Sequence, residues 1–227
     1  MRSTTPSDDQ EVDVLVVGAG ISGIDVAYHL KKRCPDRSFI IAEARERIGG
    51  TWDLFRYPGI RSDSDMHTLG LPFRPWRGEN AIVDGPAIRD YLEDTAREFG
   101  IDRHIRFGLR VVSADWDGAA CRWIVTVDAA GEESTIRARY LYWGSGYYSY
   151  SEAHAPQLAG VEDFAGQIIH PQFWPEDQQV EGKTIVVIGS GATAITLVPA
   201  LAARGARVVM LQRSPTYVVS RDPKDGI

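Results

Sequence analysis

Two short apolar runs that each lead directly into a glycine-rich loop constrain the fold of this chain most. Residues 14–17 read Val-Leu-Val-Val and precede Gly-x-Gly-x-x-Gly at residues 18–23, and residues 185–188 read Ile-Val-Val-Ile and precede Gly-x-Gly-x-x-Ala at residues 189–194. Continuous apolar runs of this kind are typical of buried parallel strands. Because a helical apolar pattern follows each loop, the sequence predicts an α/β protein with two Rossmann-like strand–loop–helix units.

The first loop is expected to bind a dinucleotide through its backbone. Gly18 permits a tight turn, Gly20 lets the backbone approach a pyrophosphate, and Gly23 allows close packing of helix on strand. The N–H groups around Ile21 and Ser22 would face the phosphates at the positive end of the helix. A glycine turn without a ligand is the alternative interpretation.

A carboxylate follows the first loop at the spacing of a ribose-binding residue. A strand predicted over residues 38–42 leads to Glu43, about 20 residues after Gly23, where an acid can accept hydrogen bonds from ribose hydroxyls. Strand, helix and acid together favour a bound dinucleotide. They do not distinguish FAD from NAD.

The second loop predicts a nicotinamide nucleotide with a 2′-phosphate. A strand predicted over residues 207–211 leads to Gln212-Arg213-Ser214, where a site for NAD would carry an acid. Arg213 can meet the 2′-phosphate of NADP with paired hydrogen bonds, although an exposed structural arginine is the alternative. Alanine in place of the third glycine should move helix and strand slightly apart. The candidate contacts here are Ser190, Gly191, Ala192, Thr193, Ala194, Arg213 and Ser214.

Between the two loops the sequence predicts a helix, a β-meander and a connection. The helix covers residues 86–99, and short antiparallel strands are expected within residues 105–142, with turns at Asp117-Gly118 and Ala130-Gly131. Residues 150–182 are rich in proline, glycine and acids, which is typical of a connection between domains. After residue 183 only one strand, one helix and one strand are predicted, fewer than a Rossmann domain needs, so we expect the chain to stop within a domain.

Composition argues against several other classes of protein. The net charge of −6 argues against a nucleic-acid partner, and no apolar run reaches the roughly 18 residues that span a membrane. Cys34 and Cys121 lack the spacing of a disulfide scaffold or a metal site. From this cysteine pattern we expect a cytoplasmic protein without a bound metal, and the polar N-terminus has no signal-peptide pattern. The oligomeric state stays open.

Two longer patterns resemble the Baeyer–Villiger branch of the class B flavin monooxygenases. Residues 49–63 match G-G-x-W-x-x-x-x-Y-P-G-x-x-x-D at every fixed position, and residues 164–175 match F-x-G-x-x-x-H-x-x-x-W-P. The resemblance covers nearly the whole chain from about residue 12. Residues 61–65 and the stretch around His170 are similar to those of a mycobacterial member of the family.

The resemblance implies positions for the flavin. Residues 51–54 would lie along the flavin, Asp63 would support the catalytic arginine beside the isoalloxazine ring, and His170 would couple the movement of two domains. Residues 139–146 resemble the flavoprotein strand that ends in a small-residue turn, and the backbone of Val111 would hold the adenine, unless Val111 is a plain core residue. The implied cofactor residues are Thr51, Trp52, Asp53, Leu54, Arg61, Ser62, Asp63 and Val111, and Asp63 is also the candidate catalytic residue.

The resemblance further implies a fold and a reaction. The fold is an FAD/NAD(P)-binding, Rossmann-like three-layer fold with an antiparallel β-meander and the start of a second Rossmann domain. Its parts are a disordered tail (1–11), the first part of an FAD domain (12–149), a linker (150–182) and an incomplete NADP domain (183–227). With FAD, NADPH and oxygen, the family converts ketones to esters or lactones through a flavin C4a-peroxide. Sulfides or thioamides are also plausible substrates.

Two other functions stay open. One is a nitrogen- or sulfur-oxygenating flavin monooxygenase, against which the Trp174-Pro175 pair argues. The other is a non-catalytic, truncated dinucleotide-binding fragment. Because family members are considerably longer and their catalytic arginine lies in the part missing here, we expect residues 1–227 alone not to turn over a ketone.

Overall fold

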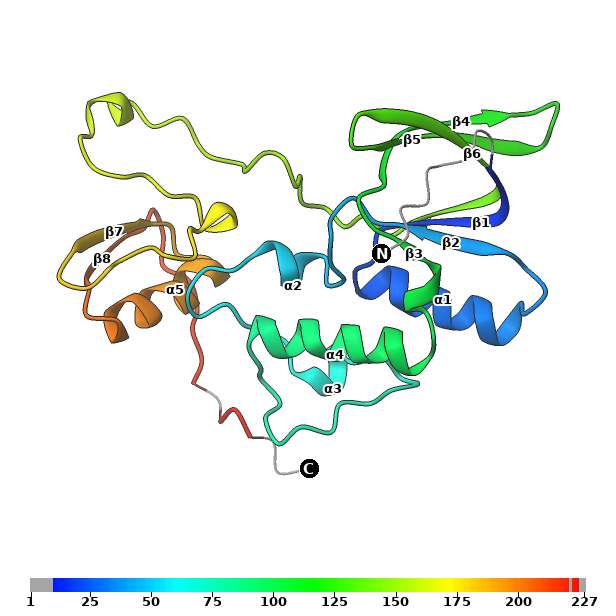
Figure 1. Cartoon of the computed structure of the whole chain (residues 1–227). Helices are drawn as coiled ribbons and strands as arrows, with labels where there is room; N and C mark the ends of the chain where they lie inside the picture. The colour runs from blue at the N-terminus through cyan, green and yellow to red at the C-terminus, as the bar shows by residue number, and fades with distance from the viewer. Residues whose placement is uncertain (1–9, 221, 225–227) are drawn as a thin grey trace. The chain divides into compact units, whose positions relative to one another are not determined.

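The computed structural model describes residues 10–220 and 222–224, which divide into two compact units (Figure 1). The first unit holds the described residues of Met1–Asp53 together with Arg89–Tyr147. The second holds Leu54–Ile88 and the described residues of Tyr148–Ile227. Residues 1–9 of the predicted tail lie outside the described residues, and the first strand begins at Gln10, inside that tail. The domain boundaries predicted from the sequence stay a prediction.

A mixed sheet of six strands forms the centre of the first unit, in the order β3-β2-β1-β6-β5-β4. Parallel pairs join β1 to β2, β1 to β6 and β2 to β3, whereas β4, β5 and β6 form an antiparallel meander. The long strand β6 therefore belongs to both halves of the sheet. The strands are β1 (Gln10–Val17), β2 (Phe39–Ala42), β3 (Ile105–Arg106), β4 (Arg110–Asp117), β5 (Arg122–Ala129) and β6 (Glu132–Trp143).

This sheet confirms the predicted α/β, Rossmann-like fold with an antiparallel meander. Both predicted turns are present: the carboxylate of Asp117 accepts hydrogen bonds from two backbone N–H groups, and Ala130 and Gly131 both have positive φ, as a two-residue type I′ hairpin requires. The prediction of an antiparallel strand at residues 105–106 was wrong. These two residues pair in parallel with β2, because the chain returns from a helix and not from a hairpin.

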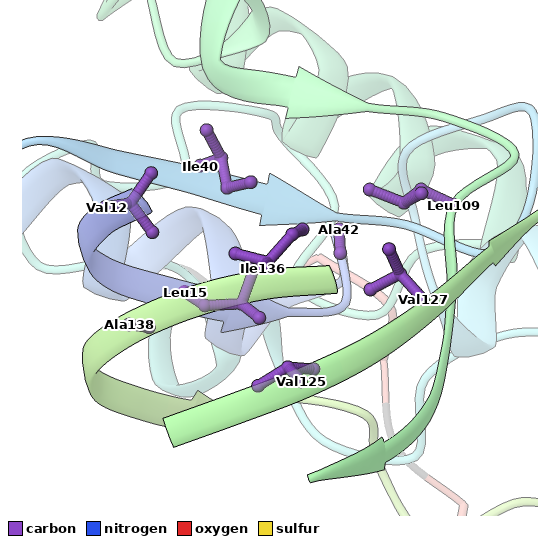
Figure 2. Close-up of a cluster of buried hydrophobic side chains, with 9 residues drawn as sticks. All are labelled: Val12, Leu15, Ile40, Ala42, Leu109, Val125, Val127, Ile136 and Ala138. Atoms are coloured by element: carbon purple, nitrogen blue, oxygen red, sulfur yellow. The ribbon is translucent and has the colours of Figure 1, made fainter. Parts of the chain in front are cut away.

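The hydrophobic core of the first unit joins the parallel and antiparallel halves of the sheet. Figure 2 shows that its side chains gather between strands β1 and β2 and the meander strands β5 and β6. Because these contacts link β1 and β2 to strands far later in the sequence, burying them fixes how the meander lies on the parallel strands. The cluster consists of Val12, Leu15, Ile40, Ala42, Leu109, Val125, Val127, Ile136 and Ala138.

Helix α1 (Ile21–Arg33) packs on β1, and its position depends on two close contacts. Ile24 and Ala27 are fully buried, and Gly23 lies against the carbonyl of Gly18. Val26 and Leu30, on the same helix, are only half-buried. The helical segments between β2 and β3 in the chain are α2 (Thr51–Leu54), α3 (Met66–Leu69), α4 (Gly85–Glu98) and the 3₁₀ turn η1 (Asp102–His104).

The second unit contains a strand–helix–strand segment. Strands β7 (Thr184–Ile188) and β8 (Arg207–Leu211) pair in parallel, and α5 (Ala192–Ala203) connects them. Gly205 follows the end of α5: it has φ +82°, and the N–H groups of Gly205 and Ala206 donate to the carbonyls of Ala202 and Leu201. The connection before β7 contains two 3₁₀ turns, η2 (Val161–Asp163) and η3 (Pro171–Phe173).

Replacing Gly23 with alanine should unfold the first unit more easily. A Cβ at this position would lie 1.9 Å from the carbonyl oxygen of Gly18, so helix and loop would have to separate. Alanine normally stabilises a helix, yet this overlap should lower the free energy of unfolding by about 3 kcal/mol or more. Urea unfolding checks the change, with Gly118→Ala as control because that site is open. A G23A protein as stable as the parent would contradict the packing described here.

Candidate nucleotide-binding sites

The first glycine loop lies where the carboxyl ends of three parallel strands meet. The N–H of Gly18 donates to the carbonyl of Ala42 at the end of β2, and the N–H of Gly144 donates to Val17 at the end of β1, both at 2.8 Å. Gly18 has φ +96°, and a Cβ there would lie 2.7 Å from the carbonyl oxygen of Gly144. The small residues predicted after β6 thus allow the close backbone contact expected of them. Ligands of open α/β sheets bind at this edge.

Gly20 has a different reason to be glycine. Its φ of −79° and ψ of −170° suit any residue, and a Cβ would meet no protein atom nearer than Gly50 Cα at 3.5 Å, an ordinary contact. Neither backbone strain nor packing within the described protein therefore requires glycine here. It caps α1 without a side-chain hydrogen bond, and the next residues are the half-buried Ile21 and the exposed Ser22. This arrangement fits a phosphate that approaches the backbone at the positive end of the helix.

Glu43 lies directly against this loop. One carboxylate oxygen accepts a hydrogen bond from the N–H of Ala19 at 2.7 Å, and the other accepts from the N–H of Arg45 at 2.9 Å. A carboxylate has about four lone-pair sites, so two remain for ribose hydroxyls. Burial raises the pKa of Glu43 above its ordinary value, while the two backbone N–H groups oppose that shift. The predicted spacing therefore brings Glu43 and the loop together.

Asp53 is held by a residue that the sequence did not single out. Its buried carboxylate accepts a hydrogen bond from the guanidinium of Arg45, which also donates to the Asp53 carbonyl at 3.2 Å. The N–H of Gly49 donates to the carbonyl of Ala19 at 3.1 Å. Hydrogen bonds thus link the loop to Glu43, Glu43 to Arg45 and Arg45 to Asp53, and the N–H of Asp53 donates to the carbonyl of Gly50 at 3.1 Å, next to Gly49. The predicted residues Thr51 and Trp52 lie in this segment, half-buried.

The second glycine loop repeats the geometry of the first. Gly191 has φ −75° and ψ −175° and caps α5 without a side-chain hydrogen bond, and a Cβ there would meet no described atom within 4 Å. Gly189 has φ +124°, and its N–H donates to Leu211 at the end of β8 at 2.8 Å, as Gly18 donates to Ala42. The predicted contacts that follow are Ala192 (exposed), Thr193 (half-buried) and Ala194 (buried).

Ser190 joins this loop to the segment after β8. Its hydroxyl donates to the carbonyl of Ser214 at 2.9 Å and accepts from the hydroxyl of Thr216 at 3.1 Å. The exposed Arg213 precedes Ser214, so the structure brings the predicted arginine to the edge of the glycine loop. Thr216 was missed, because nothing in the sequence marks a hydroxyl five residues beyond a strand as part of this contact.

The remaining predicted residues lie apart from these loops in the chain. Leu54, Arg61, Ser62 and Asp63 belong to the second unit: Ser62 is buried, and its N–H donates to Val83, whereas Asp63 is exposed. Val111 lies on β4, and its half-buried side chain packs against the core cluster, while the backbone contact with adenine stays a prediction. The ring of His170 accepts a hydrogen bond from the N–H of Gln172 and thereby caps the turn η3.

No helix among the described residues is long and apolar enough to cross a membrane.

Comparison with known proteins defines the class to which these loops belong. A model of the NAD(P)-binding Rossmann-like domain matches residues 16–79, and one of the flavin-binding monooxygenase-like family matches residues 80–227. The chain therefore belongs to the flavin-binding monooxygenase-like family, which confirms the resemblance seen in its motifs. The family's cofactors are the predicted pair, FAD and NADP.

Individual relatives agree with this assignment. The FAD-containing monooxygenase EthA of Mycobacterium tuberculosis (strain H37Rv) is 59% identical over 96% of this chain and 45% of its own length. A probable FAD-binding monooxygenase, AlmA, from an Acinetobacter species is 51% identical over 93% of this chain and 43% of its own. The chain thus spans less than half the length of these curated relatives.

Solved structures show the same fold. An oxidised steroid monooxygenase bound to NADP matches with a TM-score of 0.79 and 34% identity over 92% of this chain and 40% of its own. Cyclohexanone monooxygenase from Rhodococcus sp. Phi1, bound to NADP⁺, matches with a TM-score of 0.80 and 31% identity over 93% of this chain and 40% of its own. A complex of OTEMO with FAD and NADP has a TM-score of 0.75 and 28% identity over 90% of this chain and 39% of its own.

Glu43 should give the protein a distinctive pH dependence. Because burial raises its pKa in the folded state, the stability it contributes is present at acid pH and is lost as pH rises through that folded value. The stability of the FAD-free parent relative to Glu43→Gln should therefore fall as the pH rises above the ordinary pKa of a glutamate. Urea unfolding at several pH values measures this difference, and other acids cancel because both proteins carry them. A difference that grows with pH would contradict the assignment.

Proposed function

We propose that the protein containing this chain is an FAD- and NADPH-dependent monooxygenase that inserts one oxygen atom into a ketone to give an ester or lactone. The observation that carries this proposal is the pair Gly20 and Gly191. Both glycines cap a helix with nearly the same backbone angles, and no contact among the described residues accounts for either. Two phosphate-bearing ligands explain both positions, and the relatives carry FAD and NADP.

The chemical class of the substrate comes from the solved relatives. Cyclohexanone monooxygenase has been crystallised with cyclohexanone and with ε-caprolactone, which differ by one oxygen atom inserted beside the carbonyl. Such a conversion consumes NADPH, a proton and O₂ and releases NADP⁺ and water. The match to G-G-x-W-x-x-x-x-Y-P-G-x-x-x-D and to the pattern around His170 supports the same reaction here.

In the first unit, the chain binds and orients FAD. The N–H groups of Ile21 and Ser22 donate to its pyrophosphate, and Gly20 lets the phosphates approach the backbone. Glu43 accepts hydrogen bonds from the ribose and is held in place by Ala19 and Arg45. The bound flavin supplies the redox chemistry and the activation of oxygen, so the protein contributes binding, orientation and exclusion of water.

In the second unit, the chain binds NADPH and selects it over NADH. The N–H groups at the start of α5 donate to the pyrophosphate, and the guanidinium of Arg213 pairs with the 2′-phosphate. Ser190 supports this role because its bond to Ser214 fixes the backbone next to Arg213. Asp63, on the same unit, is proposed to support a catalytic arginine near the flavin ring. Its exposed carboxylate is available for such a partner.

The reaction itself can be tested with isotope-labelled oxygen. The purified protein that contains this chain, supplied with FAD, NADPH, ¹⁸O₂ and cyclohexanone, should form ε-caprolactone that carries one labelled atom. A matched reaction with an aryl sulfide shows whether sulfur is also oxidised. NADPH consumption with sulfoxide but no lactone would favour the nitrogen- or sulfur-oxygenating alternative and overturn the ketone assignment.

Replacing Gly20 with alanine should weaken FAD binding without unfolding the protein. A Cβ at this position meets only Gly50 at an ordinary distance, so the free energy of unfolding without FAD should change by about 1 kcal/mol or less. The same Cβ occupies space that the pyrophosphate needs, so the FAD dissociation constant should rise at least about tenfold. Fluorescence titration with FAD measures this change.

Gly191→Ala is the matched control for Gly20→Ala. It should weaken binding of NADPH and leave that of FAD unchanged, because it makes the same substitution in the second loop. Unchanged FAD affinity in G20A would show that the first loop does not hold a pyrophosphate.

Replacing Arg213 with alanine should reduce the preference for NADPH. A charge-assisted hydrogen bond is worth about 1.5–3 kcal/mol, so the KM for NADPH should rise about 10- to 100-fold while that for NADH changes little. Arg204→Ala is the control, because it removes an exposed arginine at the other end of α5. Equal effects of R213A on the two nucleotides would remove Arg213 from the 2′-phosphate site.

A further inference from the structure

Gly59, in the Tyr-Pro-Gly part of the motif at residues 49–63, packs directly on α5. It has φ +83°, and a Cβ at this position would lie 2.5 Å from the carbonyl oxygen of Thr196 and 2.8 Å from Cβ of Ala200. Both contacts lie within the second unit. The backbone of Gly59 therefore touches the helix that follows the second glycine loop, and any side chain would push that helix away.

Tyr57 reaches the same helix from a buried position. Its hydroxyl lies 3.5 Å from that of Thr196, which is only 4% exposed and also lies 3.2 Å and 3.1 Å from the carbonyls of Ala192 and Thr193. The Thr196 side chain thus lies between Tyr57 and the first turn of α5. Phe55 supports the Tyr57 ring in an edge-on contact with centroids 6.2 Å apart. The contact is therefore built from buried, oriented groups.

Helix α5 has features that make external support necessary. It contains only 12 residues, a length at which an isolated helix is marginal in water. Pro199 lies inside it and has no N–H, so one helical hydrogen bond is missing, and Gly191 gives no side-chain cap. Gly59 packs between Thr196 and Ala200, which are the residues on either side of that weak point.

We propose that Tyr57 and Gly59 position NADPH by fixing where α5 lies. The N–H groups of residues 190–193 can donate to a pyrophosphate only at narrow distances and angles, because hydrogen bonds weaken steeply when misaligned. A helix displaced at its second and third turns carries those donors with it. The motif therefore holds the second nucleotide through residues 57–59, while residues 49–53 belong to the first unit. This inference rests on the proposed function of the second loop.

Gly59→Ala, compared with Gly182→Ala, tests the proposal in the protein that contains this chain. Both glycines have positive φ, +83° and +70°, and belong to the second unit, but a Cβ at Gly182 meets no atom within 4 Å. G182A therefore reproduces the backbone strain without the contact on α5. The NADPH dissociation constant should rise at least about tenfold in G59A and less than about threefold in G182A, while FAD affinity changes less than about twofold in both.

A second readout does not depend on the nucleotide. Amide hydrogen exchange of residues 195–203 should be faster in G59A than in G182A, because α5 loses its support. If G59A does not fold, Ala200→Val introduces added volume from the helix side and should raise the NADPH dissociation constant in the same direction. Parent-like NADPH affinity in a folded G59A, or in A200V when only that variant folds, would overturn the proposal. If the parent protein binds no NADPH, the proposed function fails, and hydrogen exchange alone then decides whether residues 57–59 support α5.

Discussion

Direct backbone contact between glycines at the end of β1 is the constraint on which the packing of the first unit depends. Gly18 lies against the carbonyl of Gly144, and Gly23 lies against the carbonyl of Gly18, at distances that leave no room for a Cβ. Because glycine has no side chain at these positions, the start of helix α1 and the end of β6 can both pack against the end of β1. The helix N-terminus thereby meets the sheet edge where Glu43 emerges, so fold and nucleotide site follow from one packing requirement.

The second loop meets the same requirement with one change. Ala194 takes the place of Gly23 and is buried, so α5 cannot lie as close to its loop as α1 lies to Gly18. The bonds common to both loops do not need that contact: each first glycine donates to the end of the next parallel strand, and each second glycine accepts the first helical hydrogen bond, from Ile24 or Ile195. The sequence pattern thus determines the backbone hydrogen bonds of the loop and leaves the distance between helix and loop variable.

Local signals predicted most of the fold, and contacts between distant segments account for what they missed. Apolar runs, glycine spacing and turn residues located β1, β2, α4, the meander and both glycine loops to within a few residues. The two-residue strand β3 has no periodicity to read, and its parallel pairing is decided by β2. At the site, the spacing to Glu43 was readable because it follows from one strand–helix–strand unit. The Arg45–Asp53 pair was not, because neither residue carries a pattern until the intervening turn brings them together.

The motif at residues 49–63 shows that a matched pattern can identify a family before the physical role of each residue in the pattern is known. Its glycines occur for different reasons: Gly49 joins the first loop through its hydrogen bond to Ala19, whereas Gly59 makes room for α5 in the second unit. Its acids differ as well, since Asp53 is buried on Arg45 while Asp63 is exposed. The resemblance treats residues 49–63 as one segment along the flavin. In the structure, these residues make several different contacts, and they are divided between the two units. Because a substitution at each position disturbs a different contact, one spaced pattern constrains the packing of both units.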